Sequence, residues 1–308
     1  MHEALDPLLK TLPPKTKHAL DRAINACSAR LGLPSDWVLR WLSFTIVADA
    51  LARHRIGEGH SFELKGGAAI ELRLRRLHPG GAPTDADRSA SQPRATKDLD
   101  ATFRGVMADL EGAVRAALTT PHPAFQLGVE LETPDAANMR RFRVRVAYLE
   151  PALAGGRAPR HLNSVKLEVS CYEGTPRPPE MVPAFPLSPF GLEGPSELPC
   201  LPLVKQIAQK LHAVTERRDG DAPNDRFRDL VDLVMLSQLE PASPDLRAVC
   251  EETFTIRQKQ LWPPAVVLYP TWVEPLKARA LEMGLAITDA DEIAGFVQGY
   301  IESIARAT

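Results

Sequence analysis

The sequence predicts an α/β fold that is followed by a mainly helical body. Short runs with the two-residue alternation of strands are interleaved with helical runs up to about residue 175. Nine of the 28 prolines then fall within residues 176–202, where they exclude a long helix or a central strand. Helical periodicity dominates after them. We therefore expect a first domain at residues 1–175, a linker at 176–202 and a helical domain at 203–308.

Each expected element follows from a local pattern. Apolar residues three and four apart predict helices, and residues that alternate between apolar and polar predict strands. The expected helices are residues 8–30, 36–53, 68–74, 106–118, 203–216 and 226–239, and the expected strands are residues 62–65, 97–103, 141–148 and 165–171. Residues 78–93 are rich in Gly, Pro, Ser and Asp and have no apolar period, so we expect a loop there. This loop must extend outward if the residues on either side of it are to meet.

The composition narrows the classes of function. A hydrophobic fraction of 44% and a charged fraction of 25% are typical of a globular protein. The formal net charge of -2 excludes nucleic-acid binding through overall charge, so any such binding needs a local patch. The four cysteines form no C-x-x-C pair, and no N-terminal or internal segment is apolar for long enough to be a signal peptide or a membrane span. We expect a cytoplasmic protein without a membrane partner.

Asp98 and Asp100 are the first candidate site residues. Residues two apart on a strand point to the same face, roughly 6.6 Å apart at the backbone. Two carboxylates on one face suit Mg²⁺, including the pair of ions that serves phosphoryl or nucleotidyl transfer. The Asp-x-Asp pattern is common by itself, and the alternative is a solvated strand edge or a turn.

A glycine turn lies upstream of these acids. Lys65 ends an expected strand, and Gly66 and Gly67 lead into an expected helix. This arrangement presents backbone N–H groups to a phosphate, and Lys65 adds a cation. The alternative is a Gly-Gly pair that only separates strand from helix. Together with the later Asp-x-Asp, however, the turn resembles the ordered signature of polymerase-β-type nucleotidyltransferases.

Four blocks of the sequence make the resemblance more specific. They are FELKGGAA at residues 62–69, RATKDLD at 94–100, QIAQKLHA at 206–213 and RFRDLVDL at 226–233. In this order they resemble the AbiEii nucleotidyltransferase toxin family, which includes the MenT toxins. The resemblance extends over residues 62–239. It implies a polymerase-β-like core with N-terminal helices and a mainly helical C-terminal domain.

The resemblance also implies roles for individual residues. The nucleotide would be bound by Lys65, Gly66, Gly67 and Thr96, and the metal by Asp98, Asp100 and Glu168. The helical domain would contribute Lys210, facing the phosphates, and Asp229, an essential acid close by; with Asp98 and Asp100 they form the expected catalytic set. The alternative for Lys210 is a lysine that only extends to solvent from the edge of an apolar helix stripe.

Two of these assignments leave alternatives open. Thr96 lies where the family places a hydroxyl residue beside the metal site, but it is also an ordinary β-branched strand residue. Glu168 is the best-placed third carboxylate on a neighbouring strand. Its alternative is a cross-strand ion pair with Arg143 or Arg145.

A run of arginines supplies the clue to the acceptor. Arg141, Arg143 and Arg145 alternate with apolar residues and therefore share one face of a strand. Such a face can hold an RNA backbone through phosphate contacts, which do not read sequence. The alternative is a solvated face. The resemblance favours RNA, because MenT-type toxins add nucleotides to the 3′ end of tRNA and so block aminoacylation.

The sequence thus predicts a toxin-like nucleotidyltransferase with a two-metal Mg²⁺ site. It would transfer a nucleoside monophosphate from an NTP to RNA, with the tRNA 3′ end as the expected acceptor, and so inhibit translation and growth. The resemblance implies a cognate antitoxin as a further partner. The alternatives are nucleotidylation of a protein or small molecule, and a non-catalytic module that binds RNA or an antitoxin.

Overall fold

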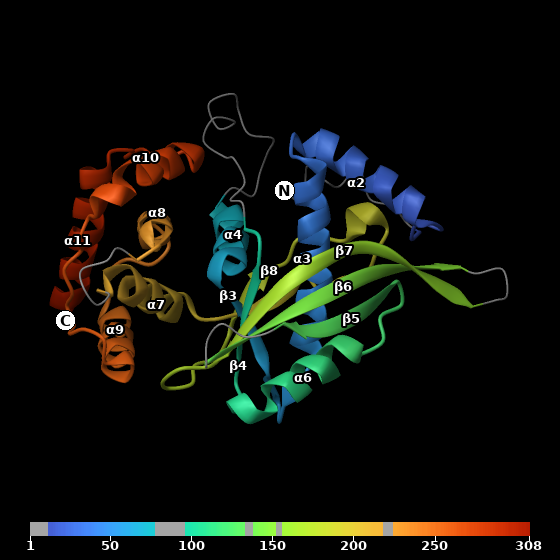
Figure 1. The fold of residues 1–308 in the computed structure, drawn as a ribbon, viewed down its shortest axis with the longest axis horizontal. Coiled ribbons are helices and arrows are strands. Elements are labelled where there is room, and N and C mark those ends of the chain that lie inside the picture. Colours follow the sequence, from blue (N-terminus) through green and yellow to red (C-terminus); the bar gives the residue numbers. More distant parts are fainter. Residues whose placement is uncertain (1–11, 78–95, 133–137, 152–155, 218–223) are drawn as a thin grey trace. The chain divides into compact units, whose positions relative to one another are not determined.

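The computed structural model describes residues 12–77, 96–132, 138–151, 156–217 and 224–308 (Figure 1). The chain divides into two compact units. Of the residues that the structure describes, those within 12–77, 96–172 and 179–201 form the first unit, and those within 173–178 and 202–308 form the second. The expected loop at residues 78–93 lies outside the described residues.

A seven-stranded mixed sheet forms the centre of the first unit. Its strands are β3 (Phe62–Lys65), β4 (Leu99–Phe103), β5 (Phe125–Glu132), β6 (Met139–Pro151), β7 (Arg157–Cys171), β8 (Glu180–Pro183) and β9 (Glu197–Cys200). Their order is β5-β6-β7-β4-β3-β9-β8. The pairs β4–β7 and β3–β9 are parallel, and the other neighbours are antiparallel. This mixed sheet with its helices confirms the expected α/β class.

Helices of the first unit surround this sheet, and all but the first of them pack against its strands (Figure 1). They are α2 (Lys17–Leu31), α3 (Ser35–Arg53), α4 (Gly66–Leu77) and α6 (Met107–Thr119), and a small hairpin of β1 (Arg55–Ile56) and β2 (Gly59–His60) follows α3. Helix α3 is buried almost throughout from Trp37 to Leu51, because it packs against α2, α6 and the strands. Helix α2 begins at Lys17, where the Thr16 side chain accepts a hydrogen bond from the Ala19 N–H group.

The two faces of the sheet differ in polarity. On one face, Leu99, Phe142 and Leu167 are fully buried and join the hydrophobic core with α2 and α3. Residues of the same strands that point the other way are mostly charged or polar. The alternation that predicted these strands thus places an apolar face on the core and a polar face opposite it.

The proline-rich stretch at residues 176–202 is not simply a linker. It contains β8 and β9, and β9 lies between β8 and β3 in the sheet. Pro183 is the last residue of β8, which forms the edge of the sheet. Pro199 belongs to β9, which pairs with β3 only through Cys200 and Leu64. Prolines are tolerated at such edge and end positions, so their number did not prevent strand formation.

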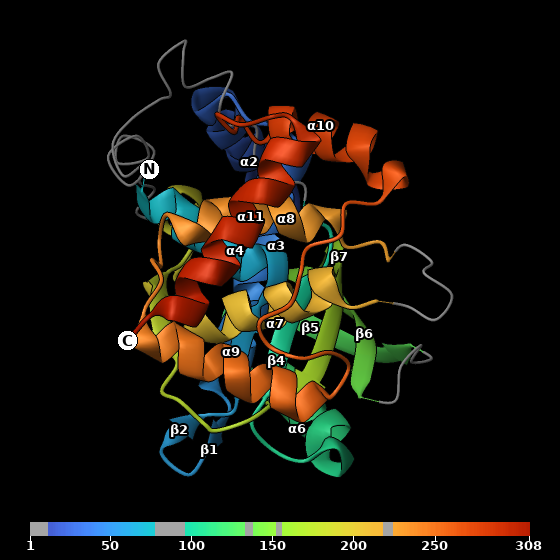
Figure 2. The same ribbon diagram turned by 90° about the vertical axis from the view of Figure 1, so that its left-hand side faces the viewer.

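Five α-helices of the second unit lie in the part of the chain that the structure describes. They are α7 (Leu203–Thr215), α8 (Phe227–Ser237), α9 (Pro244–Arg257), α10 (Val273–Glu282) and α11 (Ala290–Arg306). Helix α7 packs against α8 and α9, and α11 contacts α8, α9 and α10 (Figure 2). Ser243 caps α9 and Asp289 caps α11 through their side-chain oxygens. In the described part of the chain, no helix combines the length and apolar character needed to cross a membrane.

An ion pair holds the segment Glu173–Pro178 within the second unit. The Glu252 carboxylate accepts hydrogen bonds from Lys205 Nζ at 2.6 Å and from the Thr175 N–H group at 2.7 Å. Desolvation opposes ionisation of this group, but the bonds from Lys205 and Thr175 outweigh it and lower the pKa of Glu252 to about 2. Gly174 has a φ of 74°, which lets the chain approach this pair closely.

Candidate active site

Four charged residues predicted for the site form one row across four strands. Lys65 of β3 is opposite Asp100 of β4, Asp100 is opposite Glu168 of β7, and Glu168 is opposite Arg141 of β6. Residues at opposite positions on neighbouring strands share a face of the sheet. The pairing therefore brings two carboxylates together with one flanking cation on each side.

The glycine turn is adapted to Asp100. Gly66 has a φ of 61°, which favours glycine, and it begins α4. A Cβ atom at this position would lie 2.7 Å from Cγ of Asp100, closer than side chains tolerate. Only a glycine therefore lets the Asp100 carboxylate approach the backbone at the start of the helix.

Lys65 extends across the polar face. Its Nζ atom donates a hydrogen bond to the Ser170 hydroxyl of β7 at 2.5 Å, although β4 lies between the two strands. Ser170 follows Glu168 by two residues and shares its face. Sequence reasoning had no signal for this contact, because the two residues are 105 positions apart.

The expected strand at residues 97–103 begins later than predicted. Strand β4 starts at Leu99, and half-buried Asp98 lies in the bend before it. The alternation that was expected to align Asp98 with Asp100 therefore does not reach Asp98. Among the described residues, no group of three or more His, Cys, Asp or Glu side chains is placed to hold a metal ion.

Thr96 is buried beside α4. Its hydroxyl donates to Oε2 of Glu71 at 3.4 Å, and its carbonyl oxygen accepts from Nη1 of Arg40 at 3.2 Å. Glu71 is itself buried. The Thr96 hydroxyl thus faces a carboxylate of the protein in this structure, and its contact with a nucleotide stays a prediction.

Arg141, Arg143 and Arg145 of β6 share the polar face, as their alternation predicts, but each is paired with an acid. Arg141 Nε donates to Oε1 of Glu168 at 2.8 Å. Arg143 bonds Glu132 and Arg145 bonds Glu130, both on β5. The ion pair expected as an alternative for Glu168 does exist, but its partner is Arg141, because the register places those two residues opposite each other.

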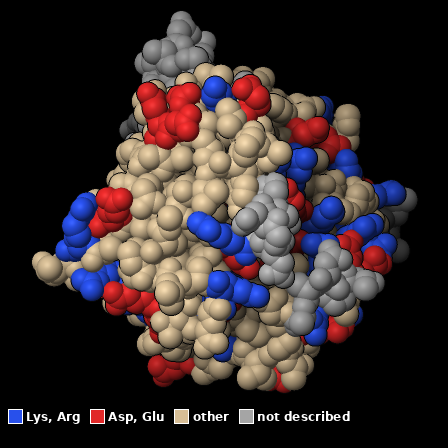
Figure 3. Space-filling model, turned by 60° about the vertical axis from the view of Figure 1, so that its left-hand side comes forward, with Lys and Arg blue, Asp and Glu red and all other residues tan. Residues whose placement is uncertain are grey.

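The charged side chains of the molecule are mixed in sign. On the face shown in Figure 3, Lys and Arg side chains alternate with Asp and Glu around a broad uncharged area. This agrees with the net charge of -2. Any RNA-binding surface on this face would be local and not a continuous basic surface.

The donor chemistry of the row fits a divalent cation. Asp100 and Glu168 are directly opposite, and two like charges at such positions repel each other unless a cation lies between or beside them. Carboxylate oxygens are the ligands that Mg²⁺ prefers. The absence of a side chain on Gly66 leaves room for the Asp100 carboxylate itself. The two carboxylates are thus suited to bind a divalent cation, although among the described residues they form no group of three acids with Asp98.

A buried ion pair lies two residues before Lys65 on the same strand. The Glu63 side chain is fully buried and accepts hydrogen bonds from Arg104, whose guanidinium lies 4.7 Å from the centre of the Tyr172 ring. Burial raises the pKa of Glu63 to about 6, and the charge of Arg104 opposes this shift. Glu63 was not among the site residues predicted from the sequence. A charged residue within a short, otherwise apolar strand was the available signal.

Lys210 and Asp229 meet within the second unit, as the sequence blocks suggested. The Lys210 ammonium donates to Oδ1 of Asp229 at 2.5 Å and to Oδ2 of Asp232 at 2.7 Å. All three side chains are largely buried, so Lys210 does not extend into solvent. Asp232 was missed as a site residue, although its spacing of three from Asp229 places both acids on one face of α8.

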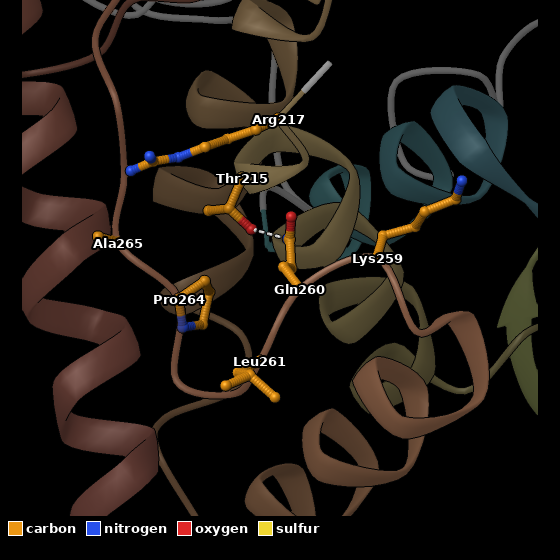
Figure 4. A pocket seen from close by; sticks show the side chains of 7 residues that line it. All are labelled: Thr215, Arg217, Lys259, Gln260, Leu261, Pro264 and Ala265. Carbon is orange, nitrogen blue, oxygen red and sulfur yellow. Dashed lines mark hydrogen bonds between the residues drawn. The ribbon is translucent and has the colours of Figure 1, made fainter. Parts of the chain in front are cut away.

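A pocket of about 230 Å³ lies at the end of α7 in the second unit (Figure 4). Its lining includes Arg217, Lys259 and Gln260, and the Gln260 amide donates to the Thr215 hydroxyl at 2.5 Å. None of the site residues predicted from the sequence lines it. We therefore assign it no part of the candidate site.

Comparison with solved structures identifies the class of the fold. The chain is similar to MenT4, a nucleotidyltransferase toxin from Mycobacterium tuberculosis H37Rv, with a TM-score of 0.52 and 16% identity over 95% of this chain and 90% of that one. JHP933 from Helicobacter pylori matches with a TM-score of 0.41 and 20% identity over 87% of this chain and 91% of that one. The sheet, the glycine turn and the likeness to MenT4 define a nucleotidyltransferase fold.

A sequence model of one family then identifies the chain further. The model described as "Nucleotidyl transferase AbiEii toxin, Type IV TA system" matches residues 49–299. The chain belongs to the AbiEii nucleotidyltransferase toxin family. Membership of this toxin–antitoxin family implies an NTP substrate and an antitoxin partner. A comparison with curated proteins gives no match.

Proposed function

We propose that this toxin transfers a nucleoside monophosphate from an NTP to RNA in a Mg²⁺-dependent reaction, with the 3′ end of a tRNA as the acceptor. The observation that supports the chemistry is the row of Lys65, Asp100 and Glu168 beside the Gly66 turn. A tRNA modified at this end would not be aminoacylated, and translation in the cytoplasm would stop.

The acids of the polar face would hold the cations. Asp98 and Asp100 would be the principal ligands, and Glu168 the third carboxylate. When bound, the divalent cations would stabilise the charge on the attacking and leaving oxygens. Asp100 lies against the glycine turn, so the carboxylate and the helix N-terminus would meet the same triphosphate.

The cationic residues would act on the triphosphate. The backbone at Gly66 and Gly67 forms the first turn of α4, at the positive end of the helix dipole, and would bind phosphate oxygens there. Lys65 would neutralise the charge that moves onto pyrophosphate as it leaves. We assign the same task to Lys210, which Asp229 and Asp232 hold in place as an ammonium group.

The acceptor would meet the outer part of β6. The side chains of Arg143 and Arg145 are 54% and 57% exposed, and each is paired with a glutamate of β5. Exposed ion pairs contribute roughly 0–1 kcal/mol, so an RNA phosphate could replace Glu132 or Glu130 as a partner at little cost. Phosphate contacts of this kind supply affinity without reading sequence.

One experiment separates the possible acceptors. The protein is incubated with Mg²⁺ and each labelled NTP in turn, together with total tRNA, a protein extract or no acceptor. We expect label on tRNA, and removal of the tRNA 3′ end should abolish it. Label on protein alone would place the reaction on another acceptor, and the absence of label in every mixture would contradict an enzymatic function.

A further inference from the structure

Arg141, Arg143 and Arg145, which share the polar face of β6, are not equivalent. Arg141 bonds Glu168 on the inner strand β7, whereas Arg143 and Arg145 bond glutamates of the edge strand β5. The Arg141 side chain is only 27% exposed, about half the value for the other two. We infer that Arg141 is a positioning residue of the metal site, acting through Glu168, and not a member of the RNA-binding face. This inference rests on the proposed function.

The choice of partner by Arg141 supports this assignment. Arg141 is opposite Glu168 on one side and Glu132 on the other. It bonds Glu168, while Glu132 accepts from Arg143, which lies diagonally across from it. The Nε and Nη2 atoms of Arg141 therefore bond the acid that neighbours Asp100.

The geometry of the pair leaves half of the Glu168 carboxylate available. Arg141 Nε and Nη2 both approach Oε1, at 2.8 Å and 2.7 Å. Oε2 accepts no hydrogen bond from any residue that the structure describes. Glu168 is thus held through one oxygen, and the other is open to a cation shared with Asp100, its opposite residue on β4.

Holding Glu168 in this way has a defined energetic role. Without Arg141, Glu168 would turn away from Asp100, because the two carboxylates repel each other. Hydrogen bonds to the ligands of a metal orient them, and their loss typically lowers metal affinity about 10- to 100-fold. Arginine offers two donors in a fixed plane, whereas lysine offers a single charged centre. Arg141→Lys therefore keeps the charge and removes the geometry that orients Glu168.

Binding of Mn²⁺ tests the inference without reference to turnover. Free Mn²⁺ is followed by electron paramagnetic resonance as the full-length protein is titrated, and melting temperatures confirm folding. Arg141→Lys should weaken Mn²⁺ binding about tenfold. The matched control is Arg160→Lys, which alters an arginine–glutamate pair between the same two strands, at the far end of β6 and β7. That control should leave Mn²⁺ binding unchanged.

A double-mutant cycle isolates the path through Glu168. Glu168→Gln alone should weaken Mn²⁺ binding, and adding Arg141→Lys to it should weaken binding no further. Unchanged or tighter Mn²⁺ binding by Arg141→Lys, or additive effects in the cycle, would overturn the inference. If the unaltered protein labels tRNA and binds Mn²⁺, and Arg141→Lys binds Mn²⁺ with the same affinity, only the inference about Arg141 fails. If the unaltered protein neither transfers label nor binds Mn²⁺, the proposed function fails instead.

Discussion

The Asp100 carboxylate occupies the space that a side chain on Gly66 would need. A Cβ atom on Gly66 would lie 2.7 Å from Asp100 Cγ and 2.9 Å from its Cβ. The acid of β4 and the first residue of α4 therefore approach each other as closely as the backbone permits. This contact joins the two sequence features, the glycine turn and the Asp-x-Asp, that predicted a nucleotidyltransferase.

The first prediction concerns this contact. Gly66→Ala should displace Asp100 and lower nucleotide transfer on the order of 100-fold. The matched control is Gly57→Ala, because Gly57 has a similar φ of 59° but no neighbouring atom within 4 Å of a new Cβ. Both variants should lose about 1–2 kcal/mol of stability from backbone strain, measured by urea unfolding. Equal activities of the two variants would refute the steric role of Gly66.

The second prediction concerns the acids. Asp98→Ala and Asp100→Ala should each lower transfer by on the order of 100-fold or more, because each removes a proposed metal ligand. Their melting temperatures should change little, since neither side chain belongs to the hydrophobic core. The control is Asp109→Ala, which makes the same substitution at an exposed position of α6. Near-normal labelling of tRNA by Asp100→Ala would exclude the metal assignment.

The third prediction separates two buried lysines of α7. Lys205 and Lys210 both form ion pairs, with Glu252 and with Asp229 and Asp232 respectively. Lys210→Gln leaves two buried carboxylates without their cation and should lower stability by about 3 kcal/mol. Lys205→Gln leaves the partly exposed Glu252 without its cation and should lower stability by less. Only Lys210→Gln should also reduce kcat once each variant is assayed well below its melting temperature. A similar kcat for both variants would show that Lys210 has a structural role alone.

The fourth prediction is a pH dependence of stability. Because the pKa of Glu63 is raised to about 6 in the folded state, the folded protein binds its proton more tightly than the unfolded chain does. Protonated Glu63 therefore contributes its full share to the free energy of unfolding below about pH 4.5. This contribution, about 2 kcal/mol, is lost as the pH rises through 6. Urea unfolding between pH 4.5 and 7 should show this slope. In Glu63→Gln this decrease of the free energy of unfolding with pH should disappear. If the unaltered protein and Glu63→Gln gave parallel curves of unfolding free energy against pH, the raised pKa of Glu63 would be contradicted.

The fifth prediction tests the acceptor surface. Arg143→Gln combined with Arg145→Gln removes two potential phosphate contacts and leaves the apolar face of β6 intact. The affinity for tRNA should fall. A plot of the logarithm of the tRNA binding constant against the logarithm of the salt concentration should become shallower by about 1.4, since each lost contact accounts for about 0.7. NTP binding should persist. Unchanged affinity and slope would mean that this part of β6 is only a solvated face, and that RNA is bound elsewhere.

Local patterns in the sequence determined much of this protein. Helical periods located α7 and α8 to within about two residues, because an apolar stripe is a property of neighbouring residues. The alternation of residues 141–146 placed three arginines on one face for the same reason. The four ordered blocks pointed to the AbiEii family, and a match over residues 49–299 confirmed it.

Only the tertiary structure decided which of these residues meet. The sequence could not show that Asp100 is opposite Glu168, that Lys65 reaches Ser170, or that Arg141 pairs with Glu168. It also misjudged the proline-rich stretch, whose strands β8 and β9 complete the sheet. The physical reason is common to all of these features. Strand order and register depend on hydrogen bonds and packing between segments far apart in the chain, and no local pattern contains that information.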